Sequence, residues 1–481
     1  MTTIKLDPGA ALLLDVLHGA GHAAYAVGGC VRDSLLGLDP HDWDLCTSAR
    51  PEQVMALFGE EKCIPTGLQH GTVTVKQGGR LYETTTFRTE GAYSDGRHPD
   101  AVCFVPDVRE DLARRDFTIN AMAYSAEEGL IDPFGGRDDL AAHLVRAVGE
   151  PERRFEEDAL RILRLYRFAA RFGFAIDPAT GAAARALGPH LDCVSAERIQ
   201  EELLKLLAAP RPGSYLEPAV LAVVLPELEP EKQPERFAEL CRTIDRIEPT
   251  AENVPTRLAA LLYPLGEAGA RKALRKLKCS NALTDEVTAL VGGSVGSFLL
   301  GHEFELRHPA DALCLERHSH PAGRCPNSNS LFPPQAAVVA VAGHSIARPI
   351  ACGNRVPPQR TVLGETPGTP NTTLTVQAKR LLGRYELPTI QRLTALCSAR
   401  HPEQAEAFSA LQAEAERLTA ENACCRVSQL AVNGRDLMAA GVRPGPGLRQ
   451  VLNALLEAVI TGQTPNEKDA LLAAAARFSA S

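Results

Sequence analysis

The stretch YAVGGCVRD at residues 25–33 decides the fold of the N-terminal part of this chain. Residues 24–27 form a short apolar run that is typical of a buried strand, and the run ends in two glycines. A helical pattern follows over 31–36, so the sequence predicts a strand, a glycine turn and a helix. Glycines at such a turn let the backbone approach a phosphate group closely, and the helix offers free N–H groups. Arg32 adds a cation at the same point.

The stretch DWDL at residues 42–45 supplies two carboxylates. Asp42 and Asp44 alternate with apolar residues, which predicts a strand over 42–46 with both side chains on one face. Two carboxylates that converge repel each other unless divalent cations lie between them, and oxygen ligands beside a phosphate cradle suit Mg²⁺. The alternative is a simple turn followed by a solvated strand end. Glu83 on the next predicted strand is a candidate third catalytic carboxylate, or else an exposed strand residue.

The other patterns before residue 137 indicate a small mixed sheet with helices. Residues 10–18 have a helical pattern, and residues 72–75 and 81–87 are rich in β-forming side chains. Two glycines between those runs predict a β-hairpin. Residues 88–100 are polar and rich in turn formers, so we expect a mobile loop there.

A second charged motif, EEDALRILRLYRFAARF, covers residues 156–172 and has a helical pattern. Its charged side chains recur every three or four residues and so share one broad helix face: Asp158, Arg161, Arg164, Arg167 and Arg171. A carboxylate accepts a hydrogen bond from an exocyclic amino group, and a guanidinium donates one to a ring nitrogen. An Asp158–Arg161 pair on one helix would therefore accept cytosine and adenine and reject uracil and guanine. The alternative is an ordinary solvated helix face.

A third motif, RRDFTINAMAY, covers residues 114–124. Arg115 beside Asp116 indicates either a buried ion pair or a contact to a triphosphate. Asn120 is interpreted as a bridge between backbone groups, and DPFGG at 132–136 as a turn.

The composition excludes several classes of protein. The chain has 481 residues, of which 45% are hydrophobic and 23% charged, which is enough for sizeable cores and excludes wholesale disorder. No apolar run approaches the ~20 residues that span a bilayer, and the first residues lack the layout of a signal peptide. We therefore expect a cytoplasmic protein without membrane contact, whose 13 cysteines are reduced. The net charge of −8 argues against a generally basic nucleic-acid binder but allows a local basic face.

Beyond residue 137 the pattern is mainly helical, with clear amphipathic spacing over 197–207. Residues 301–372 differ, because they are rich in proline and histidine and lack sustained periodicity. They are either a disordered insertion or a segment translated from the wrong reading frame. Four residues there have the chemistry of zinc ligands but lie in no recognisable knuckle, so we interpret their spacing as chance: Cys314, His318, His320 and Cys325. The predicted units are a head (1–137), a neck (138–207), a body (208–300), the irregular stretch (301–372) and a tail (373–481).

In this order the motifs resemble a known family. YAVGGCVRD, DWDL, YETTTFRTE (82–90), RRDFTINAMAY, DPFGG and the 156–172 motif are similar to class II CCA-adding tRNA nucleotidyltransferases. These belong to the polymerase-β-like superfamily, which also contains bacterial poly(A) polymerases. The likeness covers residues 20–210, and residues 430–472 also resemble the C-terminal region of the family. It implies an α+β nucleotidyltransferase head with a small mixed sheet, followed by a mostly α-helical neck, body and tail.

The resemblance also implies roles for single residues. Asp42 and Asp44 would bind the metal, and Asp158 with Arg161 would select the base. Residues 88–100 would form the loop that takes part in switching from C to A addition. The residues expected to bind nucleotide are Gly28, Gly29, Arg32, Arg115, Asp158, Arg161, Arg164 and Arg167.

The implied activity is a Mg²⁺-dependent, template-independent addition of C, C and A to the 3′ end of tRNA from CTP and ATP, with release of pyrophosphate. The close alternatives are a poly(A) polymerase and an enzyme that adds only CC or only A. A more distant alternative is a catalytically idle RNA-binding protein. Some relatives carry a metal-dependent hydrolase domain after the neck, but Tyr263 and Pro264 stand where that domain needs His-Asp. We therefore predict no phosphohydrolase activity.

Overall fold

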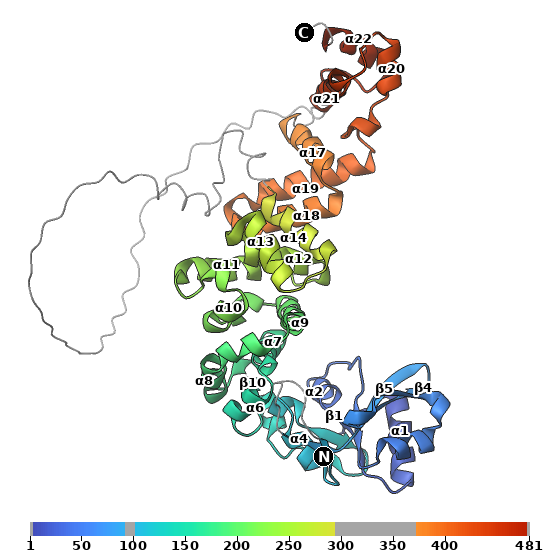
Figure 1. Cartoon of the computed structure of the whole chain (residues 1–481), viewed down its shortest axis with the longest axis vertical. Helices are drawn as coiled ribbons and strands as arrows, with labels where there is room; N and C mark the ends of the chain where they lie inside the picture. The colour runs from blue at the N-terminus through green and yellow to red at the C-terminus, as the bar shows by residue number, and fades with distance from the viewer. Residues whose placement is uncertain (1–2, 92–101, 294–371, 479–481) are drawn as a thin grey trace, which may run out of the picture.

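The computed structural model describes residues 3–91, 102–293 and 372–478. The molecule is elongated: the N-terminal sheet lies at one end, and helices lead from it to the C-terminus at the other end (Figure 1). This arrangement confirms the predicted α+β head followed by a mostly helical remainder.

The head contains a seven-stranded sheet in the order β3-β4-β5-β2-β1-β8-β9. Its strands are β1 (Ala24–Val27), β2 (Leu45–Thr47), β3 (Cys63–Gly67), β4 (Thr72–Gln77), β5 (Arg80–Thr86), β8 (Ala123–Ser125) and β9 (Gly129–Ile131). The head helices are α1 (Pro8–Gly19), α2 (Gly29–Leu35), α3 (Pro51–Phe58), α4 (Val108–Ala113) and α5 (Gly136–Ala141). β2 runs parallel to β5 and antiparallel to β1, so the sheet is mixed, as predicted.

Local sequence signals explain several of these elements. Asp7 caps α1, because its carboxylate accepts hydrogen bonds from two backbone N–H groups of the first turn. The hairpin of β4 and β5 turns at Gly78 and Gly79, which both have positive φ, as a two-residue turn of this kind requires. The predicted strand over 24–27, the hairpin and the helix after the glycine turn are therefore confirmed.

The strand predicted over 42–46 is too long. β2 begins only at Leu45, and Asp44 is joined to β1 by a single hydrogen bond, from the N–H of Val27 to its carbonyl (2.9 Å). After Val27 the backbone that follows β1 turns away at Gly28, so no hydrogen-bond ladder continues along residues 42–44. The two aspartates therefore lie in an extended segment that leads into the strand.

Parts of two predicted irregular stretches fall outside the described residues. The loop expected at 88–100 begins with β6 (Arg88–Glu90), which pairs with β7 (Val102–Phe104), so its first residues form a strand. Residues 92–101 are not described, nor are residues 294–371, which include the four residues with zinc-ligand chemistry.

The neck consists of four main helices: α6 (Pro151–Glu157), α7 (Leu160–Phe172), α8 (Pro178–Ala186) and α9 (Ala196–Leu207). α9 confirms the predicted amphipathic helix. The helix predicted over 156–172 is interrupted, because Asp158 has extended backbone angles (φ −148°, ψ 102°). Its carboxylate accepts a hydrogen bond from the N–H of Leu160 (3.1 Å) and so caps α7. Asp158 and Arg161 consequently do not lie on one helix, which corrects that expectation.

Helices from both sides of residues 294–371 build the body. They are α10 (Pro218–Val224), α11 (Pro234–Arg246), α12 (Val254–Leu262), α13 (Gly266–Lys276), α14 (Asn281–Gly292), α17 (Thr372–Arg384), α18 (Leu387–Arg400) and α19 (Ala405–Ala420). α18 packs against α11, α12 and α14, and their apolar residues belong to one core. α17 to α19 therefore pack with the body, although the predicted tail begins at 373.

A separate apolar cluster holds the C-terminal helices together. These are α20 (Gly434–Ala439), α21 (Pro446–Ile460) and α22 (Lys468–Phe478), at the far end of the molecule from the sheet (Figure 1). The exact limits of the predicted units stay predictions. Among the described helices, none combines the length and the apolar character that crossing a membrane requires.

Candidate active site

Three carboxylates lie together at one end of the central strands of the head. Asp42 and Asp44 precede β2, and Glu83 lies in β5, the parallel neighbour of β2. Leu45 pairs with Thr84, so the register places Asp44 beside Glu83 one residue earlier. We call Asp42, Asp44 and Glu83 the carboxylate trio. All three residues are exposed, and within the described residues no hydrogen bond or ion pair reaches their carboxylates.

The carboxylate trio concentrates negative charge. The pKa of Asp44 is raised from 3.8 to about 6, first by desolvation from the surrounding protein and then by the charge of Glu83. Asp42 adds to the rise, and Arg115 opposes it. In the part of the chain that the structure describes, no three His, Cys, Asp or Glu side chains are gathered closely enough to hold a metal ion by themselves. A metal ion at the trio would therefore need further oxygen ligands from water or substrate.

Gly28 and Arg115 form a donor site next to the carboxylate trio. Gly28 has a φ of 77°, and a Cβ atom there would lie only 2.8 Å from Nη1 of Arg115, so glycine alone permits this approach. Nη2 of Arg115 lies 3.4 Å from Asp111, whereas its Nε is buried and has no hydrogen-bond partner. A buried N–H without an acceptor is costly, and an anion such as a phosphate would satisfy it. Gly29 follows as the first residue of α2.

Arg32 lies beside this turn, but it is buried. Its guanidinium pairs with Asp33 at 2.7 Å, donates a hydrogen bond to Asn120 and stacks 4.9 Å from the ring centre of Phe172. Burial lowers the pKa of Arg32, and the charge of Asp33 opposes that change. Asn120 also donates a hydrogen bond to Asp116 (3.0 Å), so it bridges two side chains. The interpretation of Asn120 as a bridge between backbone groups is therefore wrong.

Asp158 and Arg161 lie at the start of α7. Oδ2 of Asp158 accepts a hydrogen bond from Nη2 of Arg198 (2.7 Å), while its Oδ1 caps the helix. Arg161 donates through Nη1 to Glu157 (2.7 Å) and through Nη1 and Nη2 to two backbone carbonyls (3.1 Å each). Its Nε–H and one N–H of Nη2 keep no acceptor among the described residues. Each carboxylate oxygen of Asp158 likewise has lone-pair capacity left.

Arg164 and Arg167, expected to bind nucleotide, are paired with carboxylates. Arg164 contacts Asp116 at 2.6 Å, and Arg167 contacts Glu202 at 2.6 Å. Glu202 also lies 3.8 Å from Arg164. We call these four residues the neck charge network. Burial acts to raise the pKa of Asp116, but the charge and hydrogen bonds of Arg164 hold it well below its usual range. Asp116 is thus the partner of Arg164, whereas Arg115 pairs with the buried Asp111 (3.4 Å), so the expected ion pair between Arg115 and Asp116 is wrong.

Sequence reasoning missed two residues of α9. Arg198 and Glu202 lie one helical turn apart and contact Asp158 and Arg167 near α7. Their spacing on an amphipathic helix was the available signal, because residues four apart share a face. Without knowledge of the packing, however, a face with two charged residues is expected to be exposed to solvent.

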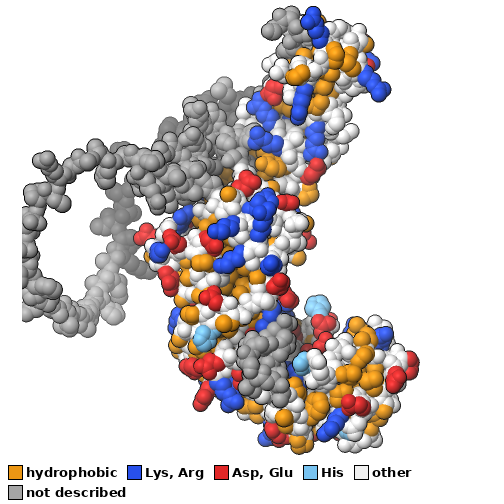
Figure 2. All heavy atoms as spheres, in the orientation of Figure 1, with side chains coloured by type: hydrophobic (Ala, Val, Ile, Leu, Met, Phe, Trp, Pro, Cys, Tyr) orange, Lys and Arg blue, Asp and Glu red, His pale blue; other side chains and the backbone are white. Residues whose placement is uncertain are grey.

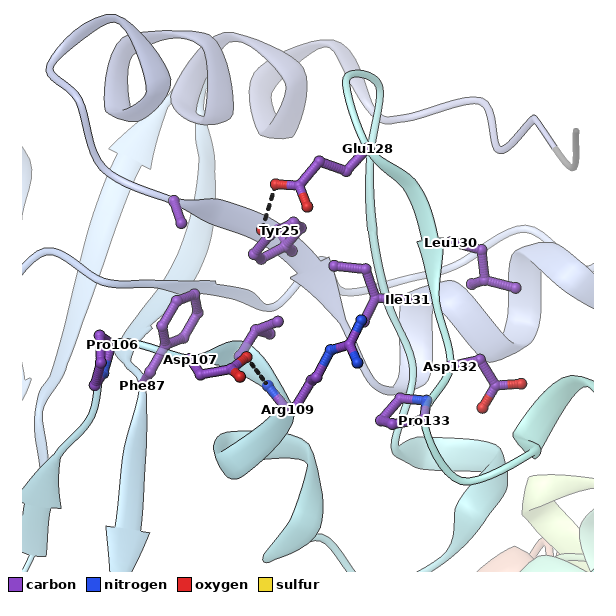
Figure 3. A pocket seen from close by; sticks show the side chains of 12 residues that line it. Tyr25, Phe87, Pro106, Asp107, Arg109, Glu128, Leu130, Ile131, Asp132 and Pro133 are labelled. Carbon is purple, nitrogen blue, oxygen red and sulfur yellow. Dashed lines mark hydrogen bonds between the residues drawn. The ribbon is translucent and has the colours of Figure 1, made fainter.

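A cavity of about 560 Å³ in the head does not belong to this site (Figure 3). It lies at the beginning of α4, where Arg109 reaches across it and Tyr25 donates a hydrogen bond to Glu128 (Figure 3). Arg115 follows the other end of the same helix, and neither it nor any member of the carboxylate trio lines the cavity.

Parts of the chain match models of known domain families. Residues 24–146 match the Poly A polymerase head domain. Residues 173–231 match the RNA and SrmB-binding site of polymerase A, and residues 384–475 match tRNA nucleotidyltransferase domain 2. The first region falls in the head, the second in the neck and body, and the third covers α18 and α19 of the body together with the C-terminal helices.

Similar proteins span almost the whole chain. The CCA-adding enzyme of Lactiplantibacillus plantarum is 33% identical over 96% of this chain and 93% of its own length. That of Levilactobacillus brevis is 34% identical over 96% of both. The crystal structure of the Bacillus stearothermophilus CCA-adding enzyme in complex with CTP superposes with a TM-score of 0.67, at 28% identity and over 98% of both chains. The chain therefore belongs to the family of CCA-adding enzymes, which are tRNA nucleotidyltransferases.

Proposed function

We propose that this protein adds C, C and A in turn to the 3′ end of tRNA, from CTP and ATP, and releases pyrophosphate. The observation that carries the proposal is the joining of two half-sites. The carboxylate trio and the buried, unpartnered donor of Arg115 lie on the head. Arg161 of the neck donates a hydrogen bond to the carbonyl of Arg114 (3.1 Å), the residue before Arg115, so the selecting pair adjoins them.

Mg²⁺ fits the donor set of the carboxylate trio, and enzymes of this family are generally metal-dependent. Asp42 and Asp44 would hold the ion, because it is usually bound by one or two carboxylates with water and substrate phosphates completing its shell. When bound, it supplies positive charge that favours attack of the tRNA 3′ hydroxyl on the α-phosphate and stabilises the leaving pyrophosphate. Glu83 acts beside them by adding negative charge at Asp44.

The chain's own donors bind the rest of the nucleotide. The turn at Gly28 and Gly29 and the open N–H of Arg115 receive the triphosphate, and Arg32 lies buried beside this turn. Asp158 accepts the exocyclic amino group of cytosine or adenine, and Arg161 donates to the ring nitrogen beside it. Uracil and guanine present the reverse pattern and would leave both groups unpaired, which disfavours them strongly.

A basic face on the body is available for the phosphate backbone of tRNA. Lys272, Arg275, Lys276 and Lys278, on and just after α13, are exposed, and Lys and Arg side chains gather over this part of the molecule (Figure 2). Such a face binds RNA phosphates despite the net charge of −8. We further propose that the protein acts in the cytoplasm. The division into head, neck, body, irregular stretch and tail stays part of the proposal, with catalysis in the head (residues 1–137).

The test is incorporation of labelled CTP and ATP, with Mg²⁺, into a tRNA transcript that lacks its last three nucleotides. Three additions in the order C, C, A that then stop are expected. Long A tracts would support the poly(A) polymerase alternative. A stop after CC, or the addition of A alone, would indicate an enzyme of restricted function.

A further inference from the structure

Arg198 of α9 is the side chain that holds Asp158. Its Nη2 lies 2.7 Å from Oδ2 of Asp158, and the two side chains are 21% and 16% exposed. The other carboxylate oxygen accepts only the backbone N–H of Leu160. Within the described residues, Arg198 therefore makes the one side-chain contact that fixes the direction of this carboxylate.

The two selecting residues are anchored by different elements. Arg161 is held by Glu157 of α6 and by carbonyls of the neck and the head. Asp158 stands in the extended break between α6 and α7, where the only other restraint on its side chain among the described residues is the hydrogen bond from the N–H of Leu160. The relative position of acceptor and donor, which distinguishes one base edge from another, thus depends on an anchor from α9.

We propose that Arg198 is a specificity-positioning residue: it orients the Asp158 carboxylate so that it accepts the amino group of cytosine or adenine while Arg161 donates. This inference rests on the proposed selection of bases by Asp158 and Arg161. Arg198 approaches Oδ2 and leaves the remaining lone pairs of the carboxylate for the base. Without Arg198 the carboxylate can rotate, and a misdirected acceptor distinguishes bases poorly because hydrogen bonds weaken steeply with angle.

The contact is not what holds α9 on α7. Leu203, Leu206 and Leu207 of α9 are buried in the main core, and Glu202 pairs independently with Arg167. A variant that lacks the Arg198 guanidinium should therefore fold and keep its helix packing. Selection of the base can then be measured separately from stability.

The experiment compares Arg198→Met and Arg198→Lys with Arg185→Met as a matched control. Arg185 lies on α8, where it is 51% exposed and 3.7 Å from Glu217, away from the selecting pair. For each variant kcat and KM are measured with CTP, ATP, UTP and GTP on full-length protein, together with the Kd for tRNA. Removing a hydrogen bond to a charged group predicts that Arg198→Met lowers the preference for CTP over UTP about tenfold, mainly through KM. Arg198→Lys should restore part of the preference, and the control should match wild type.

The Asp158→Ala background separates this inference from the proposed function. If Asp158 selects the base, Asp158→Ala alone lowers the preference, and adding Arg198→Met changes it no further. A preference unaffected by Asp158→Ala would refute the selecting pair itself. An Arg198→Met enzyme that loses kcat equally with all four nucleotides, and keeps its preference, would show a merely structural role and overturn the inference on Arg198.

Discussion

The carboxylate trio and the neck charge network use charge in opposite ways. Asp44 and its neighbours lie together without a protein cation in contact, and the pKa of Asp44 is raised, first by desolvation and then by the charges of Glu83 and Asp42. In the network every arginine has a carboxylate within 2.6 Å, and the pKa of Asp116 is lowered. Unpaired like charges leave room for a ligand at the expense of stability, whereas buried pairs fix a shape. The carboxylate trio thus suits the binding of a ligand, whereas the neck charge network suits a fixed shape.

The strongest test of this contrast removes charge from the carboxylate trio. Asp42→Ala and Asp44→Ala should each lower nucleotide incorporation by about 10³-fold or more, the effect of losing the several kcal/mol that a catalytic metal supplies. The Kd for tRNA should stay within about twofold, because neither carboxylate is needed for binding RNA phosphates. Asp192→Ala, an exposed position in the neck, serves as the control. Unchanged incorporation in either variant would refute the metal assignment.

The same kind of change in the neck charge network should act on stability. Asp116→Asn leaves Arg164 with only the more distant Glu202 (3.8 Å), and we expect a loss of about 3 kcal/mol in the free energy of unfolding, measured by denaturant titration. Because the folded pKa is depressed, the wild-type contribution is present above about pH 4 and is lost as the pH falls further. Asp192→Asn should show neither effect. A full-length Asp116→Asn protein as stable as wild type would mean that the network does not stiffen the neck.

The proposed selecting pair, Asp158 and Arg161, lies near both regions. We expect the preference among bases to depend on each of its two residues. Arg161→Ala removes the donor to the ring nitrogen, so we expect the preference for CTP over UTP to fall by about 10- to 100-fold. Affinity for tRNA should change much less. Competition of labelled CTP with UTP and GTP measures the effect. Equal discrimination in the variant and the wild type would contradict the role of Arg161.

Acidity should weaken metal binding at the trio. With a pKa of about 6, Asp44 is mostly protonated at pH 5 and mostly ionised at pH 7, so the apparent Mg²⁺ affinity should fall about tenfold between pH 7 and pH 5. Stability of the metal-free protein should depend on pH in the opposite direction. Because the folded pKa of Asp44 is raised, this group stabilises the fold at acid pH, and its contribution is lost as the pH rises through about 6. Calorimetric titration with Mg²⁺ at three pH values measures the first effect. Affinity independent of pH would show that Asp44 is not a ligand.

Glu83 should have the smallest effect, because it acts on Asp44 through its charge. Glu83→Gln relieves the repulsion while keeping the shape, and we expect incorporation to fall by no more than about tenfold. The pKa of Asp44 should fall toward its ordinary value, which moves the pH dependence of Mg²⁺ binding downward. A loss as large as that of Asp44→Ala would instead identify Glu83 as a direct metal ligand.

What the sequence predicts well is local. The strand before the glycine turn, the β4–β5 hairpin and the amphipathic helix α9 depend on periodicity and turn residues that neighbours in the chain supply. The proximity of Asp42 and Asp44 follows from their spacing alone, and Asp42 does affect the pKa of Asp44.

What the sequence does not predict depends on partners far along the chain. The 156–172 motif has an unbroken helical pattern, yet Asp158 caps α7 and pairs with Arg198, forty residues later. Asp116 adjoins Arg115 in sequence but pairs with Arg164. Periodicity cannot decide among several arginines for one carboxylate, because only the packing of neck on head brings one of them within reach.

The packing of α18 on α12 and α14 has a consequence for the order of synthesis. A ribosome makes α12 and α14 first, and their apolar faces stay uncovered until residues 387–400 have been translated and released. The middle of this molecule is therefore among the last parts to be completed, and a growing chain that stalls before α18 exposes a surface that chaperones or proteases recognise.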